Sequence, residues 1–381
     1  VANNGGPPGI TTQLTGIATG SPSVGATIAV GLTPVAVAIT PNGNYAYVVN
    51  YGTGTGNSTV SVIQNASTSS PSIVATVTVG NDPSSVSITP NGNWAYVGNL
   101  GDHTISVIQN ASTSTPSVAT TITSLPGPTN SATPFGIAFT QNSDTAYVTD
   151  QTNNWVIVLQ NTSPSSPSVL TTVNVGTTPS NSGCMGLAAP HQVLVLDSTG
   201  SDLYTIDETS LSATPVSLNL GSSVQPQNVV LTNDRMHAYI SENASNPGLI
   251  SYIAMDYESL YPPLTAGTSV SVGPQPEAMI LSPDGNYIYV ADIGQSSPTV
   301  IPPRVYRVQV SNNSVTELVS NLGGTPGNIG IDPTGAYLVV TLPSKNEIMI
   351  VSSPSGTPST STVAVGTTPM PSHSITAATV M

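Results

Sequence analysis

Four carboxylates occupy matching places in four successive segments of the chain. Each ends a short apolar run, and the runs read TAYVTD, QVLVLD, HAYISE and YIYVAD, which places the carboxylates at Asp150, Asp197, Glu242 and Asp292. Asn50, Asn99 and Thr341 hold the same place in three further segments. If these side chains lie along one rim, the four carboxylates form an acidic arc whose oxygens could bind Ca²⁺.

The alternative is that each of these side chains caps the turn that follows its own run, which requires no ion. Asn at two of the seven places suits this interpretation, because an Asn side chain hydrogen-bonds readily to a nearby backbone. We expect capping, and we predict neither a metal nor another cofactor.

The remaining reactive residue types form no familiar motif. None of the histidines pairs with another at metal-ligand spacing; they are His103, His191, His237 and His373. Cys184 is the single cysteine, which excludes an intrachain disulfide and suggests a small buried hydrophobe. The run GTGTG at 52–56 has no helix after it, so it predicts no phosphate site. No catalytic residue is predicted.

Six Asn-x-Ser/Thr sequons are candidate glycosylation sites, and they lie at Asn57, Asn65, Asn110, Asn161, Asn243 and Asn312. Three of them recur at one place, in QNAS, QNAS and QNTS, where a polar loop begins. In an exported chain such a loop is open to glycosylation. Chance is the alternative explanation in a sequence this rich in Asn.

The charge balance restricts the partners. The 381 residues include 4 Lys and Arg against 18 Asp and Glu, a formal net charge of −14. Nucleic acids and anionic membrane surfaces both require clustered cations, so neither is expected to bind. No apolar run reaches the length of a membrane span. The chain begins at Val1, which fits removal of an export signal as well as simple trimming. We expect an extracellular or cell-surface protein.

The apolar runs belong to a repeat that must position all of these residues. Seven runs recur in steps of 45 to 51 residues, at 45–50, 94–99, 145–150, 192–197, 237–242, 287–292 and 336–341. A period-2 strand and a turn such as PNGN or PDGN precede most of them. Two further strand-like stretches follow, for example STVSVIQN and IVATVTVG. Four strands in each of seven units predict an all-β, seven-bladed β-propeller of four-stranded antiparallel blades.

The motif YVxN or YVxD, with Pro-Asx-Gly before it and VGxxP leading to the next unit, resembles the YVTN β-propeller repeat. The resemblance covers the chain from about residue 24 and weakens in LAAPHQVLVLD, which lacks the Gly turn. It implies an exported prokaryotic protein such as a surface-layer component. The predicted domains are a Gly-Pro-rich extended segment at 1–23, the propeller at 24–371, and a strand at 372–381.

Two strand-like stretches are surplus to seven blades: ATIAVG at 26–31 and SHSITAATV at 372–380. They could form a partial eighth blade together with TTQLTGI at 11–17, or they could close the ring. They could also pair with a neighbouring molecule, because an unpaired strand edge templates partner strands.

Three classes of function remain. The repeat resemblance, low charge, sequons and surplus strands favour a non-enzymatic surface-layer, sheath or filament subunit or an adhesin, assembling with itself or with surface proteins and glycans. The first alternative is a secreted propeller that binds a ligand or glycan. The second is an enzyme similar to the propeller lactonases, which would need acidic, basic and cationic groups to converge. Four basic residues make that convergence hard to achieve.

Overall fold

The computed structural model describes most of the chain. The described residues are 2–3, 13–18, 23–52, 56, 58–66, 70–127, 131–150, 152–163, 166–176, 185–188, 192–197, 202–217, 225–234, 236–243, 248–254, 265–266, 269–297, 299–332, 334–345 and 347–364. The chain divides into two compact units. One comprises residues 1–172, 345–348 and 362–381, and the other comprises residues 173–344 and 349–361. Each is described by itself.

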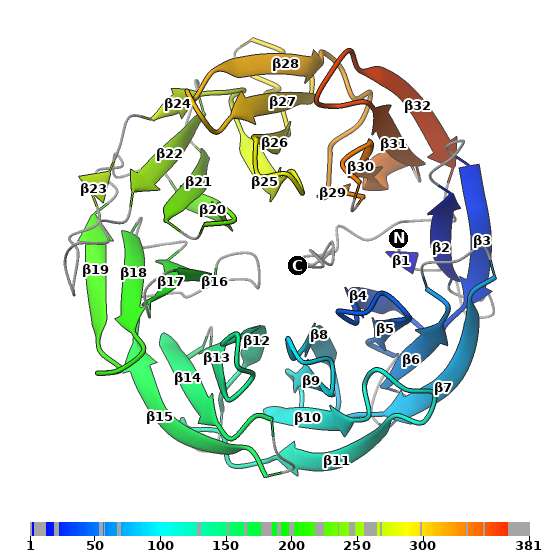
Figure 1. Ribbon diagram of the computed structural model, residues 1–381, viewed down its shortest axis with the longest axis vertical. Helices are drawn as coiled ribbons and strands as arrows, with labels where there is room; N and C mark the ends of the chain where they lie inside the picture. Colours follow the sequence, from blue (N-terminus) through cyan, green and yellow to red (C-terminus); the bar gives the residue numbers. More distant parts are fainter. Residues whose placement is uncertain are drawn as a thin grey trace. The chain divides into compact units, whose positions relative to one another are not determined.

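The first three repeats each fold into one antiparallel sheet, called a blade (Figure 1). Blade 1 contains β4 (Pro34–Ile39), β5 (Tyr45–Asn50), β6 (Thr59–Gln64) and β7 (Ser72–Thr78). Blade 2 contains β8 (Pro83–Ile88), β9 (Trp94–Asn99), β10 (Thr104–Gln109) and β11 (Ser117–Ile122). Blade 3 contains β12 (Pro134–Phe139), β13 (Thr145–Asp150), β14 (Trp155–Gln160) and β15 (Ser168–Asn174).

The remaining four repeats follow the same strand order. Blade 4 contains β16 (Met185–Ala188), β17 (Gln192–Asp197), β18 (Asp202–Asp207) and β19 (Ala213–Ser217). Blade 5 contains β20 (Gln225–Leu231), β21 (His237–Asn243) and β22 (Leu249–Ala254), and two short strands, β23 (Thr265–Ala266) and β24 (Val270–Ser271), both pair with β22.

Blade 6 contains β25 (Pro276–Leu281), β26 (Tyr287–Asp292), β27 (Arg304–Gln309) and β28 (Val315–Val319). Blade 7 contains β29 (Ile329–Ile331), β30 (Tyr337–Leu342), β31 (Glu347–Ser352) and β32 (Ser359–Ala364), with the short 3₁₀ helix η2 (Pro343–Lys345) between β30 and β31. These sheets confirm the predicted all-β, seven-bladed β-propeller class. Among the described residues, no helix is long and apolar enough to span a bilayer.

The turn between the first two strands of a blade is closed by a Thr and an Asn. In blade 1, Thr40 Oγ1 donates to Asn42 Oδ1 at 2.7 Å and accepts from the amide of Tyr45 at 3.0 Å. Blade 2 repeats these two bonds with Thr89, Asn91 and Trp94. The Asn-Gly of PNGN is explained by this geometry, because Gly43 has a φ of 72°. The turn is therefore structural.

The motif tyrosine joins neighbouring blades. Tyr47 of β5 is fully buried, and its hydroxyl donates to the carbonyl of Ala111 in blade 2 at 3.0 Å. The hydroxyl of Tyr96 donates in the same way to Thr162 of blade 3 at 2.9 Å. A buried tyrosine needs such a partner for its hydroxyl, so the recurrence of the aromatic residue reflects blade packing.

The N-terminal strands make a separate sheet. β1 (Ala2–Asn3) and β3 (Ser23–Ala29) both pair with β2 (Gln13–Ala18). Two of the stretches proposed for a partial eighth blade thus pair with each other, as that alternative requires. The C-terminal stretch 372–380 lies outside the described residues, so its pairing stays a prediction.

Candidate functional site

The final motif position of the second strand is buried in every blade, and in blades 1 and 2 it is held by hydroxyls of its own blade. Its residues are Asn50, Asn99, Asp150, Asp197, Glu242, Asp292 and Thr341. Asn99 donates from Nδ2 to Thr104 Oγ1 and to Ser106 Oγ, both at 3.0 Å. Asn50 does the same with Thr59 and Ser61. These hydroxyls lie on the first and third residues of the third strand.

A glycine in the preceding linker packs against the same side chain. A Cβ built on Gly80 would lie 2.7 Å from Cγ of Asn99, and one on Gly31 would lie 2.6 Å from Cγ of Asn50. Atoms do not approach this closely without something shifting. The glycine of VGxxP and the final Asx of the motif are therefore a contacting pair, which explains why the two recur together.

Two of the carboxylates at this position, Asp150 and Asp292, act as caps. In blade 3, Asp150 Oδ1 accepts from the amides of Thr133 and Thr152 at 3.0 and 3.1 Å. In blade 6, Asp292 accepts from the amide of Gln275 at 2.6 Å and from that of Gly294 at 3.1 Å. In the described part of the chain, no three His, Cys, Asp or Glu residues lie together as metal ligands would.

Blade 6 carries a different set of residues at the position where blades 1 and 2 have hydroxyls. Arg304 is the cross-strand partner of Asp292, as Thr104 is of Asn99. Tyr306 takes the place of Ser106 two residues further along the third strand. An amide and two hydroxyls are thus replaced by a carboxylate, a guanidinium and a phenol.

A second carboxylate completes this group. Glu317 of β28 is the cross-strand partner of Tyr306, and its Oε2 accepts from Arg304 Nη1 at 2.6 Å. The side chains of Arg304 and Glu317 are 29% and 36% exposed, whereas Asp292 is fully buried. We call Asp292, Arg304, Tyr306 and Glu317 the blade 6 cluster. It presents an accessible ion pair in front of a buried acid.

The charges of the blade 6 cluster depend on one another. Burial raises the pKa of Asp292 to about 6, although the amides of Gln275 and Gly294 and the guanidinium of Arg304 favour the charged form. Burial also raises the pKa of Tyr306, and this rise outweighs the opposing effect of the Arg304 guanidinium, so the phenol keeps its proton. The Tyr306 hydroxyl beside Arg304 raises the pKa of the guanidinium.

The guanidinium has hydrogen-bonding capacity to spare. Arg304 carries five N–H donors, and Nη1 serves Glu317. Its Nε is buried and has no hydrogen-bond partner among the described residues. A buried donor without an acceptor is costly.

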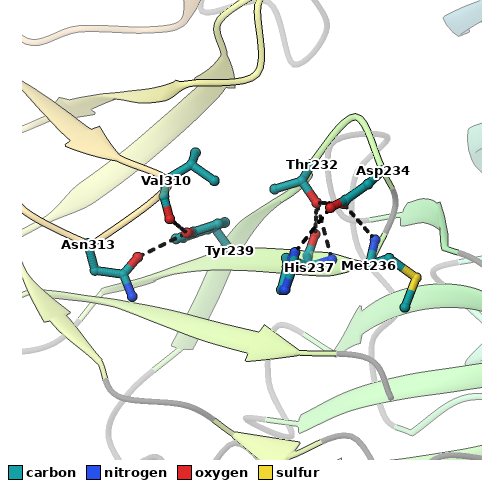
Figure 2. A network of polar contacts seen from close by, with 7 residues as sticks. All are labelled: Thr232, Asp234, Met236, His237, Tyr239, Val310 and Asn313. Carbon is teal, nitrogen blue, oxygen red and sulfur yellow. Dashed lines mark hydrogen bonds and ion pairs between the residues drawn. The ribbon is translucent and has the colours of Figure 1, made fainter. Parts of the chain in front are cut away.

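Figure 2 shows a second group of polar residues, around His237 in blade 5. His237 Nδ1 lies 3.5 Å from Asp234 Oδ2, and its ring stacks on Tyr252. Asp234, however, accepts from the hydroxyl of Thr232 and the amide of Met236, which is the turn closure already seen with Thr40 and Asn42. The Asp–His pair therefore belongs to a structural turn.

The sequons fall into three groups. Asn65, Asn110 and Asn161 are exposed and have φ values of 55°, 59° and 55°. Asn tolerates this left-handed backbone better than most residues, so the backbone alone explains why QN recurs. Asn312 is exposed as well. Asn57 and the side chain of Asn243 lie outside the described residues, as do Cys184, His191 and His373. Glycosylation stays a prediction.

No family model matches the sequence, and no curated protein does either. Solved structures are nevertheless similar over almost the whole chain. The periplasmic gluconolactonase PpgL of Pseudomonas aeruginosa is 13% identical, with 97% of both chains covered and a TM-score of 0.59. A protein assigned as a 6-phosphogluconolactonase from Bacteroides fragilis is 16% identical, with 96% of this chain and 95% of that chain covered and a TM-score of 0.57.

Another neighbour is Sqt1 of Saccharomyces cerevisiae, which is 12% identical with a TM-score of 0.68, with 96% of this chain and 89% of that chain covered. Identities this low show a common β-propeller fold, and membership of the YVTN family is not shown.

The expectation of a non-enzymatic structural subunit was wrong. Lactonases share the fold over nearly its full length, and acidic, cationic and phenolic side chains lie together in blade 6. The physical reason for the error is that a count of four basic residues describes the composition of the chain. It does not show where in the fold those residues lie. Folding pairs one of these four, Arg304, with Glu317 of the neighbouring strand and places it across from Asp292.

Proposed function

We propose that this protein is a lactonase-like hydrolase that opens the cyclic ester of a sugar acid at the blade 6 cluster. The observation that carries the proposal is the accessible Arg304–Glu317 pair at 2.6 Å, backed by the buried Asp292 and flanked by Tyr306. The lactonases among the structural neighbours support the choice of reaction class.

Lactone opening needs a base for water and donors for the oxygen that becomes negative. Glu317 takes a proton from a water molecule while the water oxygen attacks the lactone carbonyl carbon. Arg304 and the Tyr306 hydroxyl donate to the carbonyl oxygen as its charge develops. The ring C–O bond then breaks, and the released oxygen recovers the proton from Glu317, so lactone and water give one hydroxy acid.

Asp292 acts through Arg304, as a positioning residue. Its carboxylate is fixed by the amides of Gln275 and Gly294 and by the close approach of Gly273. We assign Asp292 the role of a fixed negative charge whose field acts on the Arg304 guanidinium.

Hydrolysis of glucono-δ-lactone and of its 6-phosphate by the purified full chain tests the proposal. Acid release in a pH-stat, corrected for spontaneous opening, should be saturable in at least one of them. In Glu317→Gln we expect kcat to fall by about 10² to 10⁴-fold, the usual contribution of a general base.

Thr316→Ser is the matched control, because Thr316 is the exposed neighbour of Glu317 on the same strand and pairs with Arg307 rather than with Tyr306. This control should keep full activity. If saturable hydrolysis persists at the wild-type rate in Glu317→Gln, then Glu317 is not the general base and the assignment to the blade 6 cluster is wrong.

A further inference from the structure

A pocket in blade 2 occupies the same place in the repeat as the blade 6 cluster and is lined in a different way. Its volume is about 510 Å³, which suits a small molecule. It lies between the linker after β7 and the strands β10 and β11. The polar lining consists of five hydroxyls and one carboxylate, those of Thr78, Thr104, Ser106, Thr121, Thr123 and Asp102.

Two of these hydroxyls have protons with no acceptor among the described residues. Ser106 Oγ accepts from Asn99 Nδ2 at 3.0 Å and from the amide of Gly80 at 3.4 Å, and Thr104 Oγ1 accepts from the same Asn99 Nδ2 at 3.0 Å. Both side chains are buried, with Ser106 only 1% exposed. Since neither hydroxyl donates to a protein atom, each has a proton available for a ligand oxygen in the pocket that it lines.

The carboxylate is held rigidly and retains acceptor capacity. Asp102 Oδ2 accepts from the amide of Asn81 at 2.8 Å, and Oδ1 accepts from Asn81 Nδ2 at 2.7 Å. A carboxylate has about four lone-pair positions, so two of them remain for donors from a ligand. None of the lining residues is cationic, and Val79 and Val118 add apolar surface.

We infer that this pocket binds an uncharged saccharide. A sugar supplies hydroxyl donors for Asp102, oxygens for the protons of Thr104 and Ser106, and C–H faces for the two valines. An anion finds no positive charge in the lining and meets Asp102. The site is independent of the proposed hydrolysis, since it lies in blade 2 and the blade 6 cluster takes no part in it.

Saturation-transfer-difference NMR with maltotriose and the full chain tests the inference. We expect transfer from the protein to the sugar protons at millimolar concentration. Thr121→Tyr fills the pocket from an exposed position on an outer strand, where tyrosine is well tolerated. This variant should abolish the transfer and should keep lactone hydrolysis, because Thr121 is remote in sequence from the blade 6 cluster and belongs to another blade.

Thr316→Tyr is the matched control, because it adds the same ring at an exposed site on the outer strand β28. It should keep the transfer. Absence of transfer in the wild type would overturn the inference, and so would equal transfer in wild type and Thr121→Tyr. Ser106→Ala gives a second readout with little risk to folding, and we expect it to weaken the transfer.

Discussion

At the scale of single residues, one position in the repeat accounts for much of the chemistry. In blade 2 this position is Asn99, which faces Thr104 and Ser106, and in blade 6 it is Asp292, which has Arg304 and Tyr306 at the matching places. The acidic substitutions were visible in the sequence. Their partners could not be assigned, because Arg304 and Glu317 lie on strands whose register is set by loops of unequal length.

Glu242 of blade 5 is a carboxylate at this position that lacks the amide donors of Asp150 and Asp292. Its side chain is fully buried, and among the described residues neither carboxylate oxygen has a hydrogen-bond partner. Burial raises the pKa of Glu242 above its ordinary value of 4.5, and the nearby Ser251 hydroxyl opposes the rise only in part. A folded-state pKa above the unfolded one stabilises the fold at low pH, and this contribution is lost as the pH rises through the folded value.

We therefore predict that Glu242→Gln, which carries no charge at any pH, is more stable than the wild type at pH 7. The gain should vanish near pH 4, where the wild-type carboxyl is also neutral. Urea unfolding at both pH values measures the difference. An equal stability difference between variant and wild type at pH 4 and at pH 7 would mean that the charge of Glu242 does not destabilise the wild type at pH 7.

At the scale of elements, the repeat motif can be explained contact by contact. The turn closes through Thr40 and Asn42, the tyrosine of the second strand reaches the next blade, and the final Asx packs on the linker glycine. Because these contacts are local or recur with the repeat, the sequence predicted the second strands closely. For example, the predicted strand at 145–150 is β13 (Thr145–Asp150).

Gly80 tests the contact between linker and motif. In Gly80→Ala the added Cβ would lie 2.7 Å from Cγ of Asn99, so either the linker or the Asn99 hydrogen bonds must move. We expect a loss of about 1 to 3 kcal/mol in the free energy of unfolding, the usual cost of overpacking.

Gly356→Ala is the control for Gly80→Ala, because its nearest neighbouring atom would be 3.9 Å from the new Cβ. Chemical denaturation of both variants gives the comparison. Equal small effects in the two variants would show that the close approach of Gly80 to Asn99 does not constrain the blade.

At the scale of the whole molecule, the sequence repeat was enough to predict the fold class, but it was not enough to predict the function. Seven units of four strands were countable in the sequence, since period and alternation survive without any knowledge of tertiary contacts. A net charge of −14 with 4 basic residues suggested that a cluster of acidic, basic and cationic groups would be hard to assemble. That expectation missed the blade 6 cluster, because composition does not record which side chains meet across β26, β27 and β28.

The central claim is that Arg304 stabilises charge in lactone opening, and the chain offers a matched comparison on one strand. Arg307 lies on the other face of β27, over the ring of Tyr287, and donates to the carbonyl of Pro354 at 3.0 Å. The measurement is kcat/KM for the lactone that the wild type hydrolyses, in Arg304→Gln and in Arg307→Gln. We predict a loss of about 10² to 10³-fold for Arg304→Gln, as for an oxyanion donor, and less than a tenfold change for Arg307→Gln. Equal activity in the two variants, or no hydrolysis above the spontaneous rate in the wild type, would contradict the account.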